Sequence, residues 1–121
     1  MRVFRYEEDR LPVLIFVTYF ALDMLVFLNA KSLWFLIFWL VLGVIPKTCI
    51  CALNHHHQHV LTFEHDLLNR LLEVIFAFQT GLCGNAWVLH HVVGHHKNYL
   101  DQEIDESRWK RCDGSQMSKV E

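Results

Sequence analysis

Two long runs of apolar residues dominate the first half of the chain. Residues 11–28 contain one charged side chain, Asp23, and at about 1.5 Å per helical residue they span about 27 Å, close to the thickness of a bilayer core. Residues 33–45 form the most apolar stretch, and the apolar pattern resumes at residues 48–53. Each run is long enough to predict a helix that crosses a membrane.

The segment between the runs predicts how the two helices are joined. Residues 29–32 suffice only for a tight turn, and Ser32 can cap the second helix. Pro46 is expected to kink that helix, and Lys47 is expected to reach toward lipid headgroups. Residues 11–53 are therefore predicted to form a transmembrane helical hairpin.

The remaining segments differ in polarity. Residues 1–10 read as a polar, solvated leader, residues 54–100 carry all the histidines, and residues 101–121 form a polar tail. Within the histidine region, residues 66–80 have apolar side chains spaced by three and four, which predicts an amphipathic helix along the membrane surface or against the other helices. The fold class is therefore all-α, a membrane hairpin followed by amphipathic helices.

Charge indicates orientation and limits the partners. Three arginines precede the first helix, and Lys47, Arg70 and Lys97 lie at or beyond the end of the hairpin, whereas the turn holds only Lys31. The positive-inside rule therefore places both termini and the histidine region in the cytoplasm. A net charge of −2 and the lack of a basic stripe make nucleic acid an unlikely partner.

Nine histidines in 121 residues indicate a metal site. They occur in two dense groups, residues 55–59 and 90–96, with His65 between them. Imidazole is the commonest side-chain ligand for iron, zinc, copper and nickel. Solvated histidines at headgroup level would be the alternative, but two groups on the same side of a hairpin favour metal binding.

The spacing within each group selects the candidate ligands. His55 and His59 are four residues apart, so on a helix they share one face, and His91 and His95 repeat that spacing. His96 is expected to point elsewhere on the same helix, which would suit a second metal ion. The candidate metal ligands are therefore His55, His59, His91, His95 and His96, and no catalytic residue beyond them is predicted.

The other histidines are expected to matter less. His56, His57 and His90 are predicted to be solvated or to support the ligands, and replacing His57 by alanine is expected to leave iron binding nearly unchanged. His65 is predicted to be structural. Gly94 removes a side chain where another helix can approach.

Four cysteines, Cys49, Cys51, Cys83 and Cys112, form no Cys-x-x-Cys pair and are predicted to be reduced thiols. Cys49 and Cys51 are expected to be small buried hydrophobic side chains, with a soft metal site as the alternative.

The two histidine groups resemble the first two of the three histidine boxes in the membrane fatty acid desaturase and hydroxylase superfamily, over about residues 11–99. His55 and His59 match the first box, and His91, His95 and His96 match the second. The Gly-His-His ending at residues 94–96 also resembles the second box of membrane alkane hydroxylases. The spacing leaves desaturation and hydroxylation both open.

The resemblance implies a site of two non-haem iron ions that uses dioxygen to attack a lipid acyl or alkyl chain. It also implies an electron donor such as a ferredoxin, a rubredoxin or a cytochrome. Members of the superfamily carry a third box, but no histidine follows His96 here. The sequence is therefore expected to be the N-terminal part of a longer enzyme, or to obtain the missing box from a second chain.

A membrane metal-binding protein that handles iron, zinc or copper without chemistry is the alternative, and copper would also draw on Cys49 and Cys51. A bis-histidine haem protein would need histidines within facing membrane helices, whereas these are expected to lie beyond the helix ends. Substrate, electron donor and oligomeric state are left open by the sequence.

Overall fold

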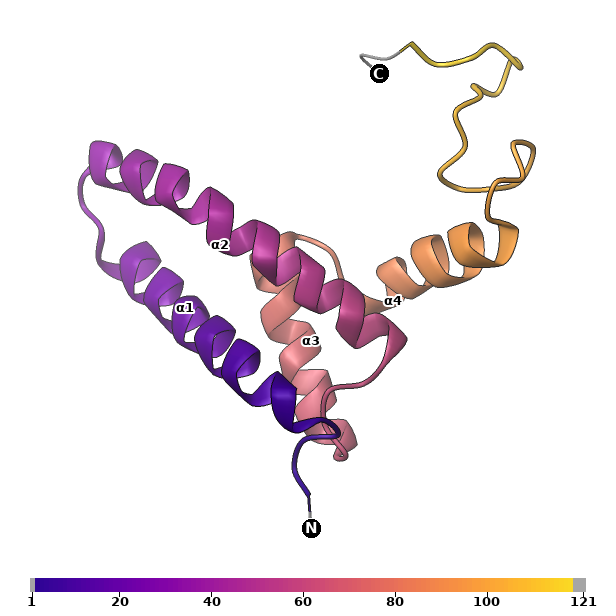
Figure 1. The fold of residues 1–121 in the computed structure, drawn as a ribbon. Coiled ribbons are helices and arrows are strands. Elements are labelled where there is room, and N and C mark those ends of the chain that lie inside the picture. The colour runs from indigo at the N-terminus through magenta and orange to yellow at the C-terminus, as the bar shows by residue number, and fades with distance from the viewer. Residues whose placement is uncertain (1, 119–121) are drawn as a thin grey trace. The chain divides into compact units, whose positions relative to one another are not determined.

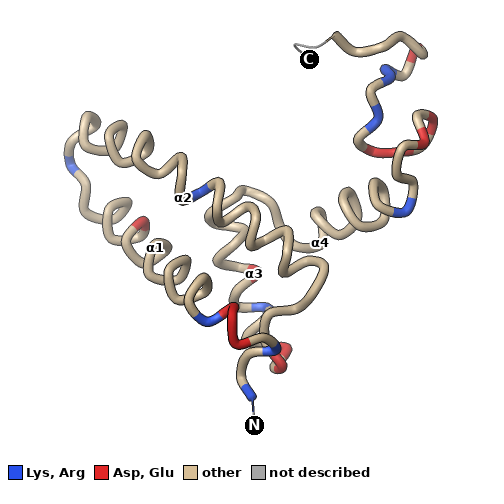
Figure 2. Tube along the Cα trace, in the orientation of Figure 1, with Lys and Arg blue, Asp and Glu red and all other residues tan. Residues whose placement is uncertain are grey.

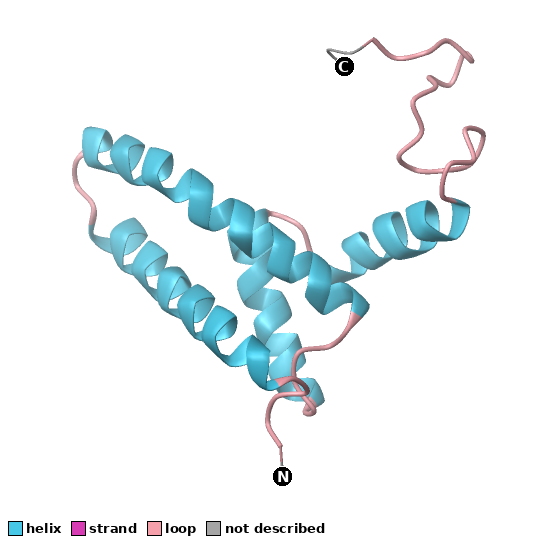
Figure 3. Ribbon diagram, in the orientation of Figure 1, coloured by secondary structure: helices cyan, strands magenta, loops and turns pink. Residues whose placement is uncertain are grey.

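A computed structural model describes residues 2–118 of the chain, which divide into two compact units, residues 1–84 and 85–121 (Figure 1). The fold is all-α, as predicted. Among the described residues Figure 3 shows helices and loops, and extended pairing is limited to two isolated bridges, Phe4 with Phe63 and Lys110 with Gln116.

The first unit is built on a hairpin of two long helices. A short 3-10 turn, η1 (Glu7–Asp9), leads into α1 (Arg10–Asn29), and α2 (Leu33–His59) returns antiparallel to it. Both helices are long and apolar enough to span a membrane, and few of their residues are buried within the protein. As predicted, Ser32 caps α2, accepting a hydrogen bond from the backbone N–H of Phe35 at 3.4 Å. The helix continues through Pro46 to the first histidine group.

Lys47 does not reach for headgroups, contrary to the prediction. Its ammonium group donates to Asp23 Oδ2 and to Gln79 Oε1, both at 2.6 Å. The second oxygen of Asp23 accepts from the indole N–H of Trp39 at 2.7 Å, and the Lys47 ammonium lies 5.4 Å from the Tyr19 ring centroid. An ion pair with a full set of partners is the arrangement by which charged groups are accommodated within apolar helices.

The amphipathic helix α3 (Asp66–Thr80) has the limits that the sequence pattern predicted and packs against the hairpin. Leu72 and Phe76 are buried against Ile50, Leu53 and Phe63 in the core of this unit. His65 caps the start of α3 by accepting from the Leu67 N–H at 3.3 Å, which confirms its structural role. The helix ends at Gly81, whose φ of 75° is a left-handed conformation that glycine adopts without strain.

The N-terminal segment is mostly exposed, but its backbone is bonded to the rest of the unit. Its backbone pairs with the loop between α2 and α3, through Arg5 N–H to Thr62 O at 2.9 Å and Glu64 N–H to Val3 O at 3.0 Å. The side chain of Asp9 is buried. Figure 2 shows that charge gathers at this end of the hairpin, while the helices themselves are almost uncharged. The leader therefore closes the end of the unit that carries the first histidine group.

The second unit begins within a short helical segment. The helix α4 (Gly84–Trp87) continues directly into η2 (Val88–His95), a π-helix, and then into a 3-10 turn, η3 (His96–Asn98). Residues 99–118 follow as turns and loops (Figure 3). The second histidine group therefore lies on a widened helix and not on a regular α-helix.

Candidate metal centre

The last turns of α2 bring the first two predicted ligands together. His55 and His59 are one helical turn apart, and their Nε2 atoms are 3.0 Å from each other. The centroids of the two rings are 4.9 Å apart. Both side chains are at least partly exposed, so this pair presents its nitrogens at the surface of the first unit.

In the second unit the π-helix decides which histidines meet. A π-helix bonds residue i to residue i+5, which places side chains five positions apart on one face. The backbone N–H of His96 bonds to the carbonyl of His91, and the Nε2 atoms of these two residues are 3.0 Å apart. The prediction that His96 would point away from the face of His91 is therefore wrong.

His95 has a different partner. Its Nδ1 lies 2.8 Å from Asp105 Oδ1, and its ring is 5.2 Å from the Tyr99 ring, centroid to centroid. The hydrogen bond from His95, with others from the backbone N–H groups of Ser107 and Leu100, holds the pKa of Asp105 below its usual value even though burial opposes this. Asp105 belongs to the segment that the sequence described only as a polar tail, and the missed signal was the Asp-x-Ser spacing of a side-chain turn.

Both histidine pairs fit a metal ion. With metal–nitrogen distances of about 2.1 Å, two imidazole nitrogens at right angles on one ion lie about 3.0 Å apart. Each pair has this separation between its Nε2 atoms. Each of the four residues, His55, His59, His91 and His96, can offer one ring nitrogen as a ligand. Neutral imidazole suits iron, zinc, copper and nickel, so the donors agree with an iron site without selecting it.

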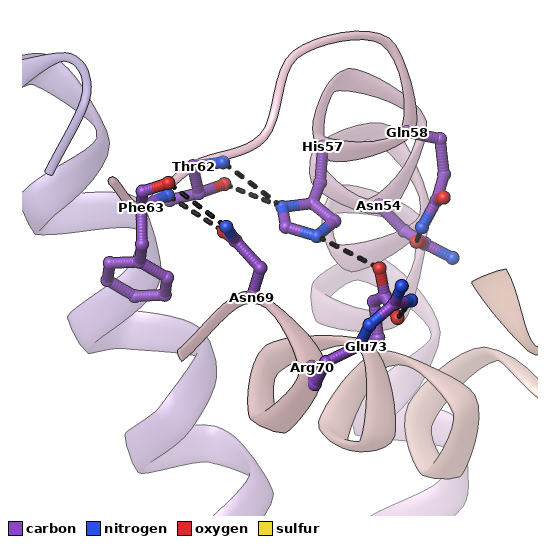
Figure 4. Close-up of polar contacts among 8 residues, drawn as sticks. All are labelled: Asn54, His57, Gln58, Thr62, Phe63, Asn69, Arg70 and Glu73. Carbon is purple, nitrogen blue, oxygen red and sulfur yellow. Dashed lines mark hydrogen bonds and ion pairs between the residues drawn. The ribbon is translucent and has the colours of Figure 1, made fainter. Parts of the chain in front are cut away.

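His57 is not solvated, the role that the sequence favoured, but fits the other predicted role, that of a group that supports the ligands. The side chain is fully buried, and Figure 4 shows it between the end of α2, the following loop and α3. Nδ1 accepts from the backbone N–H of Thr62 at 3.3 Å and contacts its hydroxyl at 2.9 Å. The ring proton therefore lies on Nε2, which faces Glu73 Oε1 at 3.8 Å. His57 joins the helix that carries His55 and His59 to the rest of the unit.

The same loop is held by a second polar contact. Asn69 accepts from the backbone N–H of Phe63 at 2.9 Å and donates to its carbonyl at 3.0 Å (Figure 4). Glu73 also pairs with Arg70 at 2.8 Å. Side chains of α3 therefore support the first histidine pair, and the sequence did not connect this helix with that pair.

Replacing His57 by alanine is expected to lower the free energy of unfolding by about 2–4 kcal/mol, because the change leaves a cavity and removes the acceptor of a buried N–H. The matched control is His56→Ala, because His56 is exposed and its one ion-pair contact, with Asp9, is long at 3.9 Å. This change should alter the free energy of unfolding by no more than about 0.5 kcal/mol. Denaturant unfolding in detergent measures both. Equal stability of the two variants would contradict the role of His57.

The other candidates are placed as follows. His56 and His90 are exposed, as predicted. Cys49 and Cys51 are also exposed, so their predicted burial inside the protein is wrong, because they lie on the outer surface of α2 where a membrane would supply lipid. In the described part of the chain no cysteine belongs to a group that could hold a metal ion.

The structure thus defines an all-α protein with a membrane-type hairpin and histidine pairs spaced as metal ligands. The family model for fatty acid desaturases matches residues 31–117, which is most of the chain. The chain therefore belongs to the fatty acid desaturase family, as the resemblance of its histidine groups had indicated. Comparisons with curated proteins and with solved structures gave no match.

Proposed function

We propose that this protein is part of an iron-dependent membrane oxidoreductase that desaturates or hydroxylates lipid acyl or alkyl chains with dioxygen. Family membership implies a lipid acyl substrate and association with a membrane. The observation that carries the proposal is the pairing of imidazole nitrogens at 3.0 Å in both histidine groups of a desaturase-family chain. In this proposal His55 and His59 form one pair of metal ligands in the first unit, and His91 and His96 form another in the second unit, where His95 adds a further nitrogen.

The chemistry that bound iron would supply here is the activation of dioxygen, with electrons from a donor protein, for attack on an unactivated C–H bond. The protein's own residues hold and orient the ligands. His57 fixes the end of α2 against the loop at Thr62, so His55 and His59 keep their separation. The i to i+5 bond between the backbones of His91 and His96 does the same for the second pair.

The first unit also has a place for an alkyl chain. A groove of about 270 Å³ lies between α1, α2 and α3, lined mainly by apolar side chains that include Phe20, Phe27 and Phe78. Lys47 also lines the groove, and it lies eight residues before His55, about 12 Å along the helix. An alkyl chain that rises from the groove along α2 would therefore approach the first histidine pair.

The proposal includes partners and an orientation. Five histidines supply five nitrogens, whereas two iron ions take more ligands, so we infer that further histidines, from a longer form of this protein or from a second chain, complete the site. Electrons come from a ferredoxin, a rubredoxin or a cytochrome. Both termini and both histidine groups face the cytoplasm in this proposal. The reason is that the segments outside the hairpin carry more basic residues than the turn, which holds Lys31.

Analysis of the lipids in a bacterial host that produces the chain tests the proposal. Mass spectrometry is expected to find new double bonds or hydroxyl groups on acyl or alkyl chains in cells that produce the wild-type protein together with an electron donor and a partner chain. Cells with His55→Ala or His91→Ala should lack these products and keep normal amounts of protein. Iron binding without any oxidised lipid, in the presence of an electron donor and a partner chain, would favour a metal-handling protein instead.

A further inference from the structure

We propose that Asp105 is a positioning residue for the metal site, which fixes the ring of His95 so that its Nε2 is presented as a ligand. This inference rests on the proposed function, because it concerns how one of the five candidate ligands is prepared. It gives a role in the site to a segment whose composition indicated only a solvated tail.

The contact itself determines the form of His95. A carboxylate is only an acceptor, so at 2.8 Å from Asp105 Oδ1 the Nδ1 atom of His95 must carry the hydrogen. The other ring nitrogen, Nε2, then has its lone pair available for a metal ion. A hydrogen bond from a ligating histidine to a carboxylate orients the ring and makes the imidazole a stronger donor.

Asp105 is itself held in place. Its Oδ1 accepts from the Ser107 N–H at 2.7 Å, and its Oδ2 accepts from the Leu100 N–H at 3.1 Å. The side chain of Asp105 is almost fully buried, whereas about a fifth of the His95 side chain is exposed. A buried carboxylate with both oxygens bonded has little freedom to move, so the direction of the His95 ring is set by the loop that carries Asp105.

The loop is in turn fixed against the π-helix. A Cβ atom at Gly94 would overlap the side chain of Glu106, so the glycine lets the loop approach the helix directly beside His95. The sequence predicted a close approach at Gly94 by a helix, and the structure shows a loop there. Leu100 has a φ of 66°, an unfavourable conformation for leucine, and its N–H is one of the donors to Asp105. The loop therefore adopts a strained backbone conformation in which the carboxylate meets His95.

The chain offers a matched control for the turn. Asp113 forms the same side-chain turn, accepting from the Ser115 N–H at 2.9 Å and from the Ser115 hydroxyl at 2.7 Å. Both aspartates lie in the same unit, and the contacts of Asp113 lie within its own turn. Asp113→Asn therefore removes the charge of a turn aspartate that bonds to Ser115, while Asp105→Asn removes the charge that faces His95.

The test is an anaerobic titration with Fe(II) of the full chain in detergent. Asparagine at position 105 has one acceptor oxygen, so it can keep only one of the bonds from the backbone N–H groups of Ser107 and Leu100. Where its NH2 group takes the place of Oδ1 it donates to Nδ1, so the form of His95 is no longer fixed. Asp105→Asn is expected to weaken Fe(II) binding about 10- to 100-fold, the range typical of partners that orient metal ligands. Asp113→Asn should bind as the wild type does, and circular dichroism should show the same helix content in all three proteins.

A second readout reports on the ring directly. In ¹⁵N spectra of the metal-free wild-type protein, His95 is expected to carry its hydrogen on Nδ1, and in Asp105→Asn it is expected to populate both neutral forms. Unchanged Fe(II) binding by Asp105→Asn, or equal weakening by both asparagine variants, would overturn the role of Asp105. If His91→Ala loses Fe(II) while Asp105→Asn keeps it, only this inference fails. Wild-type protein that binds no Fe(II) would overturn the metal site and this inference together.

Discussion

Alanine at His55, His59, His91 or His96 is expected to abolish iron binding, because each change removes one nitrogen of a pair whose separation fits two ligands of one ion. A lone imidazole left on an exposed helix end binds iron far more weakly than a pair held in place. Alanine at His95 should have the same effect in this account. Elemental analysis of the protein, purified with iron supplied and air excluded, measures the loss.

The controls for these variants are the neighbouring exposed histidines. His56→Ala and His90→Ala change the local density of histidine without touching either pair, so they should retain the wild-type iron content. His57→Ala is a poorer control, because that side chain is buried and supports the end of α2. Equal loss of iron at all positions, or loss at none of them, would count against the assignment of the ligands.

Replacing Lys47 by methionine is expected to destabilise the hairpin by about 1–3 kcal/mol, which is less than the cost of breaking a fully buried ion pair because the Lys47 side chain is 39% exposed and that of Asp23 is 16% exposed. Asp23 would keep its hydrogen bond from Trp39 but lose the ammonium group at 2.6 Å, within helices that a membrane surrounds. Gln79 on α3 would lose the same donor, so the contact between α3 and the hairpin should also weaken. Unfolding by denaturing detergent measures the change.

A double variant distinguishes the loss of the Asp23–Lys47 ion pair from other effects of changing Lys47. Asp23→Asn together with Lys47→Met removes both charges, so it should recover most of the stability lost in Lys47→Met alone. Lys31→Met, in the turn between the two helices, is the matched control and should change stability by less than about 0.5 kcal/mol. A double variant as unstable as the single one would show that Lys47 does not act through Asp23.

The sequence predicted the elements well, because their signals are local. Two long apolar runs, the Ser32 cap and the three- and four-residue spacing in residues 66–80 each lie within one segment, and α1 and α3 follow them closely, while α2 continues beyond residue 53 to His59. The ion pair of Lys47 was not predicted, because its partner Asp23 lies on another helix. Which faces of two helices meet depends on packing that neither segment encodes alone.

The sequence predicted which histidines belong to the candidate site, but not which of them lie next to each other. The spacing of residues 91, 95 and 96 was interpreted for an α-helix, and over so short a segment the pattern does not distinguish that helix from a π-helix. The role of His57 depends on Thr62 and on α3, so among adjacent histidines the buried one could not be recognised. Asp105 was overlooked because a polar loop usually indicates solvation.

The central claim, that the histidine groups of this desaturase-family chain hold iron, is tested most directly by the metal content of the wild-type protein. The chain is purified in detergent with iron supplied and air excluded, and its metals are measured by elemental analysis. About two iron ions per chain or per dimer are expected, the stoichiometry of a two-iron site. Zinc or copper in place of iron, or no bound metal, would contradict this claim.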